Sequence, residues 1–170
     1  MFWARVLILS PDNDVTNIEI ILDAFADIEA DVFPKASLPS ITLADLMGYD
    51  VVFTTNNTQW LGSGGVAPAV IGDLLADNID AGGKVISNQF NYSYDAWKLE
   101  GRFIDEQYGP FTPSTTDAIV DVELGTILAP GHSILEGVTE VGYSGFVQNV
   151  GLAPGATALA EWDNGELFLA

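Results

Sequence analysis

The chain has 170 residues, the size of one domain, and 48% of them are hydrophobic, so global disorder is excluded. It carries 24 acidic residues against 5 basic ones, a formal net charge of −19, which excludes nucleic acid and anionic membranes as partners because phosphate binding needs Lys and Arg. Cysteine is absent, which excludes disulfides and thiolate metal sites, and no apolar run is long enough for membrane insertion.

Apolar runs alternate with helical patterns through the first half of the chain. Runs that are hydrophobic on both faces predict buried parallel strands, and apolar residues three or four positions apart predict helices. The predicted elements are a strand at 5–9, a helix at 15–28 with Asp14 as its N-cap, a strand at 30–34, a helix at 42–47, a strand at 49–55, a helix at 66–81 and a strand at 84–87. This alternation predicts right-handed crossovers and a mostly parallel sheet with helices on both faces.

The second half is less regular. We expect one or two short helices in 94–106, a rigid aromatic turn at 108–113, and a strand with one exposed face at 118–124, where apolar and acidic residues alternate. Residues 131–138 predict a loop with one helical turn. Segments 156–162 and 167–170 predict a β-hairpin around Asp163-Asn164-Gly165. Because the last strand stops abruptly, we expect the single domain 1–170 to be part of a longer protein.

Six sequence segments, taken in chain order, resemble a known family. They are 6–9 followed by Asp12-Asn13-Asp14, then 46–53, 82–87, 101–103 with 108–111, 132–138, and 158–165. Together they resemble the class I glutamine amidotransferase-like superfamily, in the branch of trehalose-utilisation-type domains and unassigned domains of secreted microbial proteins. The resemblance implies an α/β fold, a flavodoxin-like three-layer sandwich with a mostly parallel central sheet and a C-terminal β-hairpin.

The chain departs from this family at the catalytic elbow. Active amidotransferases place a cysteine after the Gly-Gly strand, whereas this chain has Ser87-Asn88-Gln89-Phe90 there, and the family's paired histidine and glutamate have no clear match. The departure implies a non-catalytic binding or spacer module of a larger secreted or cell-surface microbial protein. Its expected partners are the other domains of that protein or a small-molecule or carbohydrate ligand.

A second hypothesis is a hydrolase that acts on a small or carbohydrate-derived substrate. Serine catalysis needs a nucleophile, a base and an orienting acid. Ser87 or Asn88 would stand at the nucleophile's place, and His132, the only histidine, would be the base, with Asp12 beside them. A simpler interpretation makes His132 a turn residue. A hydrolase needs an open pocket with a base in reach, whereas a module would have that crevice filled by aromatic side chains.

Polar residues follow the predicted strands. Ligands of open parallel sheets bind beyond the carboxyl ends of the strands, so the candidate ligand-binding residues are Asp12, Asn13, Asn56, Asn88 and Gln89. The alternative is that these side chains cap helices and make turns. Asp12 and Asp14 are also candidate metal ligands, although a helix cap explains Asp14 more simply.

Aromatic residues gather around the fourth predicted strand and predict either a stacking surface or a small core: Trp60, Phe90, Tyr92, Tyr94, Trp97 and Tyr108. We expect no cofactor, because the glycine-rich loop at 62–65 lacks the lysine and spacing of a phosphate-binding loop. The acidic excess fits an extracellular or cell-surface location, where divalent cations sit among carboxylates. It also fits the cytoplasm of a salt-loving microbe, where salt screens the repulsion.

Overall fold

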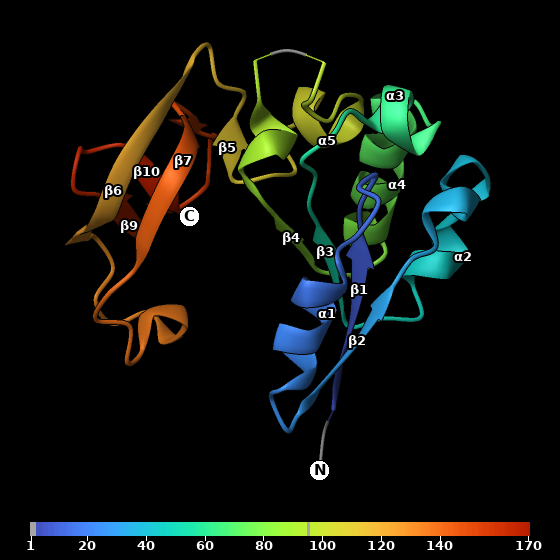
Figure 1. Ribbon diagram of the computed structural model, residues 1–170, viewed down its shortest axis with the longest axis horizontal. Coiled ribbons are helices and arrows are strands. Elements are labelled where there is room, and N and C mark those ends of the chain that lie inside the picture. The colour runs from blue at the N-terminus through green and yellow to red at the C-terminus, as the bar shows by residue number, and fades with distance from the viewer. Residues whose placement is uncertain (1–2, 95) are drawn as a thin grey trace.

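The computed structural model describes residues 3–94 and 96–170. It is a mixed α/β structure in which a four-stranded parallel sheet with its helices lies beside an antiparallel β-layer (Figure 1). Asp95, in the segment predicted to hold short helices, lies outside the described residues. No helix among the described residues has the length and apolar character to cross a bilayer.

The parallel sheet, here called sheet A, has the strand order β2-β1-β3-β4. Its strands are β1 (Ala4–Leu9), β2 (Ile28–Val32), β3 (Val51–Thr54) and β4 (Val85–Ser87). β1 pairs in parallel with β2 and β3, and β4 pairs in parallel with β3. The prediction of four parallel strands is therefore confirmed. Both faces of β1 are buried, which explains its continuous apolar run.

The main core lies on the first face of sheet A, under α2 (Leu43–Leu46), α3 (Trp60–Gly64) and α4 (Pro68–Asp80). Leu7 and Leu9 of β1 meet Trp60 and Leu75 in this core. α5 (Arg102–Asp105) packs against α4. Gly72 permits this packing, because a Cβ there would lie 1.9 Å from the carbonyl oxygen of Glu100.

The second face of sheet A is covered over β1 and β2 by α1 (Thr16–Asp23), which packs on Val6 and Ile8. The helix is shorter than the predicted 15–28, because the chain turns after Asp23 to enter β2 at Ile28. Its N-cap is Val15 and not Asp14 as predicted, so that prediction is wrong by one residue. On the same face Ile86 of β4 is 55% exposed, so the β4 side of the sheet is open.

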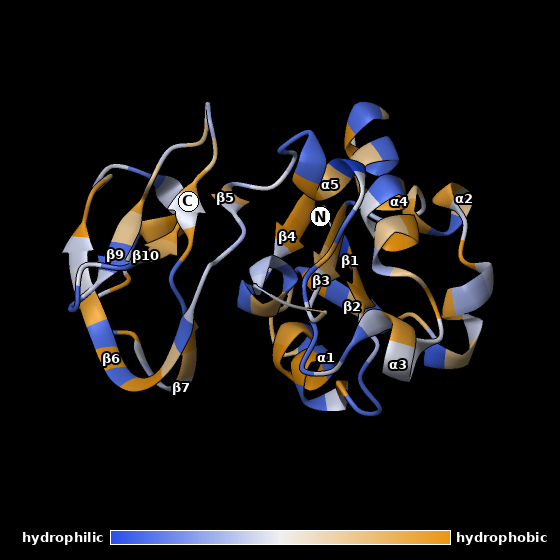
Figure 2. Cartoon of the chain, turned by 90° about the horizontal axis from the view of Figure 1, so that it is seen from above, coloured by the Kyte–Doolittle hydropathy of each residue, from blue (hydrophilic) through white to orange (hydrophobic). Residues whose placement is uncertain are grey.

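The β-layer has the strand order β10-β9-β6-β7. Its strands are β6 (Asp117–Ile127), β7 (Gly142–Gln148), β9 (Ala160–Trp162) and β10 (Leu167–Leu169). β9 and β10 form the predicted hairpin, and Gly165 in its turn has φ 85°. The small pair β5 (Phe111–Thr112) and β8 (Gly151–Leu152) lies between the two parts, as Figure 2 shows from above for β5.

Hydropathy differs between the strands and the loops that follow them. In Figure 2 hydrophobic residues concentrate in the strands of sheet A and on α1, whereas much of the loop chain is hydrophilic. Some hydrophobic side chains of α1 face solvent, since Ile20 is 64% exposed. The β-layer has a small core of its own, formed by Val122, Val147 and Trp162.

Candidate functional site

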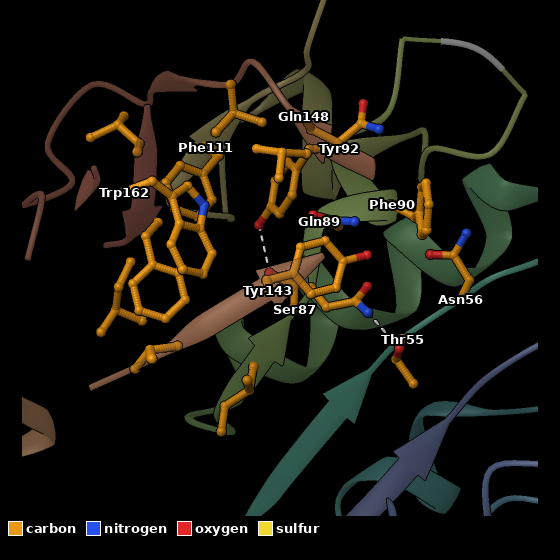
Figure 3. Close-up of a pocket in the computed structure, with 18 of the residues that line it drawn as sticks. Thr55, Asn56, Ser87, Gln89, Phe90, Tyr92, Phe111, Tyr143, Gln148 and Trp162 are labelled. Carbon is orange, nitrogen blue, oxygen red and sulfur yellow. Dashed lines mark hydrogen bonds between the residues drawn. The ribbon is translucent and has the colours of Figure 1, made fainter. Parts of the chain in front are cut away.

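A cleft of about 590 Å³ lies between the open side of sheet A and the β-layer (Figure 3). One wall consists of residues at the ends of β3 and β4 and of the 3-10 helix η2 (Gln89–Tyr92). The opposite wall consists of residues of β7, β9 and β10, including Tyr143, Gln148 and Trp162. None of the described residues that line the cleft is charged, although the chain carries 24 acidic residues. The described lining therefore offers no ionic partner to a charged ligand.

The predicted catalytic elbow forms part of this wall. Asn88 has φ −100° and ψ 177°, which is ordinary extended backbone without the strain of a nucleophile elbow. Its Nδ2 donates a hydrogen bond to Thr55 Oγ1 at 2.6 Å. The hydroxyls of Ser87 and Tyr92 share a hydrogen bond of 2.6 Å, drawn as a dashed line in Figure 3. Burial raises the pKa of the Tyr92 hydroxyl well above its usual range, so this partner of Ser87 is no base at neutral pH.

Three carboxamides at the cleft have buried atoms without a partner among the described residues. Asn56 and Asn88 each use their NH₂ group, but their Oδ1 atoms accept nothing. Gln148, 2% exposed, leaves both Nε2 and Oε1 unpaired. A buried polar atom without a hydrogen bond costs about 1–3 kcal/mol, and native proteins pair nearly all of them. Four of the seven such atoms among the described residues belong to these three cleft-lining carboxamides.

Aromatic rings flank the cleft without filling it. Phe90 packs against Trp97, with ring centroids 5.5 Å apart, and also contacts Phe146 at 6.4 Å. Trp162 stacks on Phe168 at 4.1 Å on the opposite wall. The crevice is open, and so differs from the crevice filled by aromatic side chains that was expected of a module. The relaxed backbone of Asn88, in turn, differs from the strained elbow expected of an enzyme.

The other predicted ligand-binding residues lie at the same edge of sheet A and bind protein atoms. Asp12 accepts hydrogen bonds from the Asn57 backbone at 2.8 and 3.0 Å and from Thr58 Oγ1 at 2.7 Å, and so joins the loops after β1 and β3. Asn13 Oδ1 accepts from Lys35 Nζ at 2.7 Å. Neither Asp12 nor Asn13 lines the cleft, whereas Asn56, Asn88 and Gln89 do. Gln89 Nε2 donates to the carbonyl of Phe146 and so links η2 to β7.

The candidate metal ligands have hydrogen-bond partners too. Asp14 accepts a hydrogen bond from the backbone of Thr16 at 3.0 Å, and the backbone and side chain of Thr16 together lower the pKa of its carboxyl. Among the described residues there is no group of three or more His, Asp or Glu side chains that could hold a metal ion.

His132 lies outside the cleft. It caps the single turn η3 (Ser133–Leu135), where its Nδ1 accepts from the Ile134 backbone at 3.4 Å. Figure 1 places this orange turn at the foot of the β-layer, whereas the yellow-green turn that follows β4 lies near the top. The structure therefore brings Ser87 and Asn88 to the cleft without His132.

The sequence did not predict the wall that comes from the β-layer. β7, with Tyr143 and Gln148, falls in a stretch where no strand was predicted. Its only signal is the run Phe146-Val147-Gln148, and Gly142 and Gly145 interrupt the pattern before it.

Comparison with known proteins gives a likeness of fold. No family model matches the chain, and no curated protein matches it. Among solved structures it is similar to the cytoplasmic protein STM1381 from Salmonella typhimurium LT2, with 13% sequence identity and a TM-score of 0.61. The match covers 96% of this chain and 80% of that one. At this identity the likeness shows a shared fold alone.

Proposed function

We propose that this chain is a non-catalytic module that binds an uncharged small molecule in the cleft between sheet A and the β-layer. The observation that carries the proposal is a cleft whose described lining residues are all uncharged, in a chain of net charge −19. Small-molecule sites are typically apolar concavities with a few polar groups that orient the ligand. Aromatic walls and carboxamides supply both here.

The polar contacts support binding over hydrolysis. Ser87 shares its hydrogen bond with Tyr92, a group that stays protonated, and His132 lies elsewhere. A nucleophile is activated by an adjacent base or by a lowered pKa, and neither is next to Ser87. The best use of Ser87 and Asn88 is therefore as hydrogen-bonding groups of the cleft wall.

The strand order supports the finer description of the fold. We propose a flavodoxin-like domain related to the amidotransferase-like superfamily, acting as a binding or spacer module of a larger protein. The order β2-β1-β3-β4 equals the first four positions of the flavodoxin order. The cleft lies at the ends of β3 and β4, where such sheets bind ligands.

Binding of uncharged and charged probes tests the function. We expect quinoline, uncharged at pH 7.5, to shift the backbone NMR signals of residues at the cleft, and quinoline-2-carboxylate to shift none. Ile86 lines the cleft and is 55% exposed, so Ile86→Glu adds a charge there without burying it. Quinoline in the cleft would displace water from the new carboxylate, and desolvating a carboxylate is costly. We therefore expect this variant to lose at least about tenfold in affinity for quinoline.

Ile20→Glu is the matched control, since Ile20 is 64% exposed on α1 and does not line the cleft. It should bind quinoline as the unmodified chain does. Equal affinity in both variants, or no binding of any uncharged ring, would refute the proposal.

For the compartment we propose the cytoplasm of a salt-loving microbe over an extracellular location. The structural neighbour is a cytoplasmic protein, which fits this proposal. With a net charge of −19, self-repulsion should fall as salt rises. We expect the melting temperature to climb from 0.1 to 2 M KCl. A chain stabilised fully by millimolar calcium, with no further gain from KCl, would contradict this location.

A further inference from the structure

We propose that the cleft selects a flat, uncharged ring whose edge presents a hydrogen-bond donor beside an acceptor, and that Gln148 reads this edge through two parallel hydrogen bonds. The inference rests on the proposed function and names the class of ligand. Lactams and nucleobase-like heterocycles carry such an edge.

Gln148 is a buried carboxamide in the lining of the cleft. Its side chain enters the cleft from β7, and neither Nε2 nor Oε1 has a partner among the described residues. Figure 3 shows its carboxamide at the top of the cleft, on the far side of Gln89 from Ser87. A carboxamide offers a donor and an acceptor side by side in one plane. A ligand edge with one N–H and one C=O satisfies both atoms at once, which a ligand with a single polar atom cannot do.

Asn56 and Asn88 bias the cleft toward ligands that bring donors. Each donates its NH₂ group to protein oxygens and leaves Oδ1, an acceptor, unpaired and buried. The amide oxygen and the NH₂ group of a carboxamide bind separate partners, so each Oδ1 can accept from a ligand while its NH₂ group keeps its protein partner. A ring with acceptors alone would leave both Oδ1 atoms unpaired, at a cost for each.

The walls supply the preference for a flat ring. Trp162 and Phe168 stack on one side, and Tyr92 meets Phe111 edge to face with centroids 5.5 Å apart. Aromatic side chains favour ring partners in offset-stacked or edge-to-face arrangements. A volume of about 590 Å³ lies in the range of small-molecule sites and accommodates a fused two-ring compound.

A matched pair of probes tests the inference. Quinolin-2-one carries N–H beside C=O, and 1-methylquinolin-2-one keeps the ring and the carbonyl but lacks the donor. Titration followed by NMR, including the indole signal of Trp162, gives both dissociation constants. We expect the methylated ring to bind at least about tenfold more weakly, because a site built to pair a donor rejects the analogue that lacks it.

The variant Gln148→Met removes the reading group and keeps its shape. In this variant we expect the two probes to differ by less than about threefold, since the unpaired amide no longer discriminates. Equal affinity of the two probes for the unmodified chain overturns the inference while leaving the proposed function standing. If neither probe nor quinoline binds, the proposed function itself fails.

Thermal melting of the free protein provides a second test. Replacing an unpaired buried amide by an apolar group of similar shape removes a desolvation cost, so Gln148→Met should melt at the same or a higher temperature. Gln89→Met is the matched control, because Gln89 Nε2 is paired with Phe146 and its loss should lower the melting temperature. If Gln148→Met melts several degrees lower, Gln148 is structural and the inference is overturned.

Discussion

The α/β half, formed by sheet A and its helices, and the β-layer differ in the size of their hydrophobic cores. Beneath α4, thirteen buried apolar side chains form one cluster against sheet A, whereas the described core of the β-layer has three. Apolar burial contributes roughly 25 cal/mol per Å², so the α/β half has by far the larger driving force. The β-layer packs against the α/β half through β5, β8 and contacts between β7 and η2. Its stability therefore depends on that half.

This difference explains where the cleft lies. A tightly packed core leaves few voids larger than a water molecule. Between the large core of the α/β half and the small core of the β-layer, neither core fills the space. At this place Ile86 of β4 has no helix above it. The wall of the cleft that the β-layer supplies is thus the less stable wall, and a ligand that touched both walls would stabilise it.

The largest effect should follow from damage to the strong core. Leu75 is fully buried in it, and Leu75→Ala should cost about 2–5 kcal/mol of unfolding free energy through the cavity it leaves. Because the β-layer leans on this half, we expect both halves to unfold in one transition when denaturation is followed by circular dichroism and by Trp fluorescence. Two separate transitions would show that the β-layer unfolds independently of the α/β half.

A smaller and more local effect should follow in the weak core. Val147→Ala removes two buried methyl groups from β7 at about 0.8 kcal/mol each, so we expect a loss of about 1–2 kcal/mol. Hydrogen exchange should quicken in β6, β7 and β9 and stay slow in β1 and β3, because a weak region opens without the rest. Faster exchange throughout sheet A would contradict two halves of unequal strength.

The smallest effect concerns the surface of the strong half. The Arg102 guanidinium bonds Asp80 at 2.7 Å, and this bond, helped by the Tyr108 hydroxyl, lowers the pKa of the Asp80 carboxyl below 3.8. A depressed carboxyl pKa stabilises the fold above the unfolded pKa, and this contribution is lost as pH falls through the folded pKa.

In Arg102→Met the depression of the Asp80 pKa becomes smaller, because only the hydrogen bond from Tyr108 remains. We therefore expect the variant to be slightly less stable than the unmodified chain at pH 7 and to lose stability less steeply between about pH 4 and pH 2. Urea unfolding at a series of pH values measures this slope. Parallel curves for the two proteins would show that Arg102 and Asp80 are not coupled.

The strands of sheet A could be predicted from the sequence because apolar runs form them, and β1 is buried on both faces. The runs at 5–9 and 49–55 contain few polar residues, and the pattern of a parallel strand is then unmistakable. The end of α1 could not be predicted, because apolar residues continue past Asp23 at helical spacing, up to Ile28, which already belongs to β2. The local pattern of apolar residues does not show at which residue the helix ends and the next strand begins.

Only half of the candidate site could be predicted. Residues that follow a parallel strand lie at a known edge, so Asn56, Asn88 and Gln89 could be placed there from the sequence. Gln148 could not, because its position depends on how the β-layer folds back on sheet A, a long-range contact with no local signature. Ser87 and His132 have the side chains of a nucleophile and a base, but no local pattern shows how far apart two residues lie in the fold.

The strand order of sheet A also bears on self-assembly. It leaves β2 and β4 as edge strands, and exposed edges recruit strands of other molecules into aggregates and fibrils. β4 is only three residues long, and β2 carries Glu29 and Asp31, which share the single cation of Arg5. Two copies that met along β2 would bring four carboxylates together around two arginines. The carboxylates of β2 therefore oppose growth of the native sheet into a fibril along that strand.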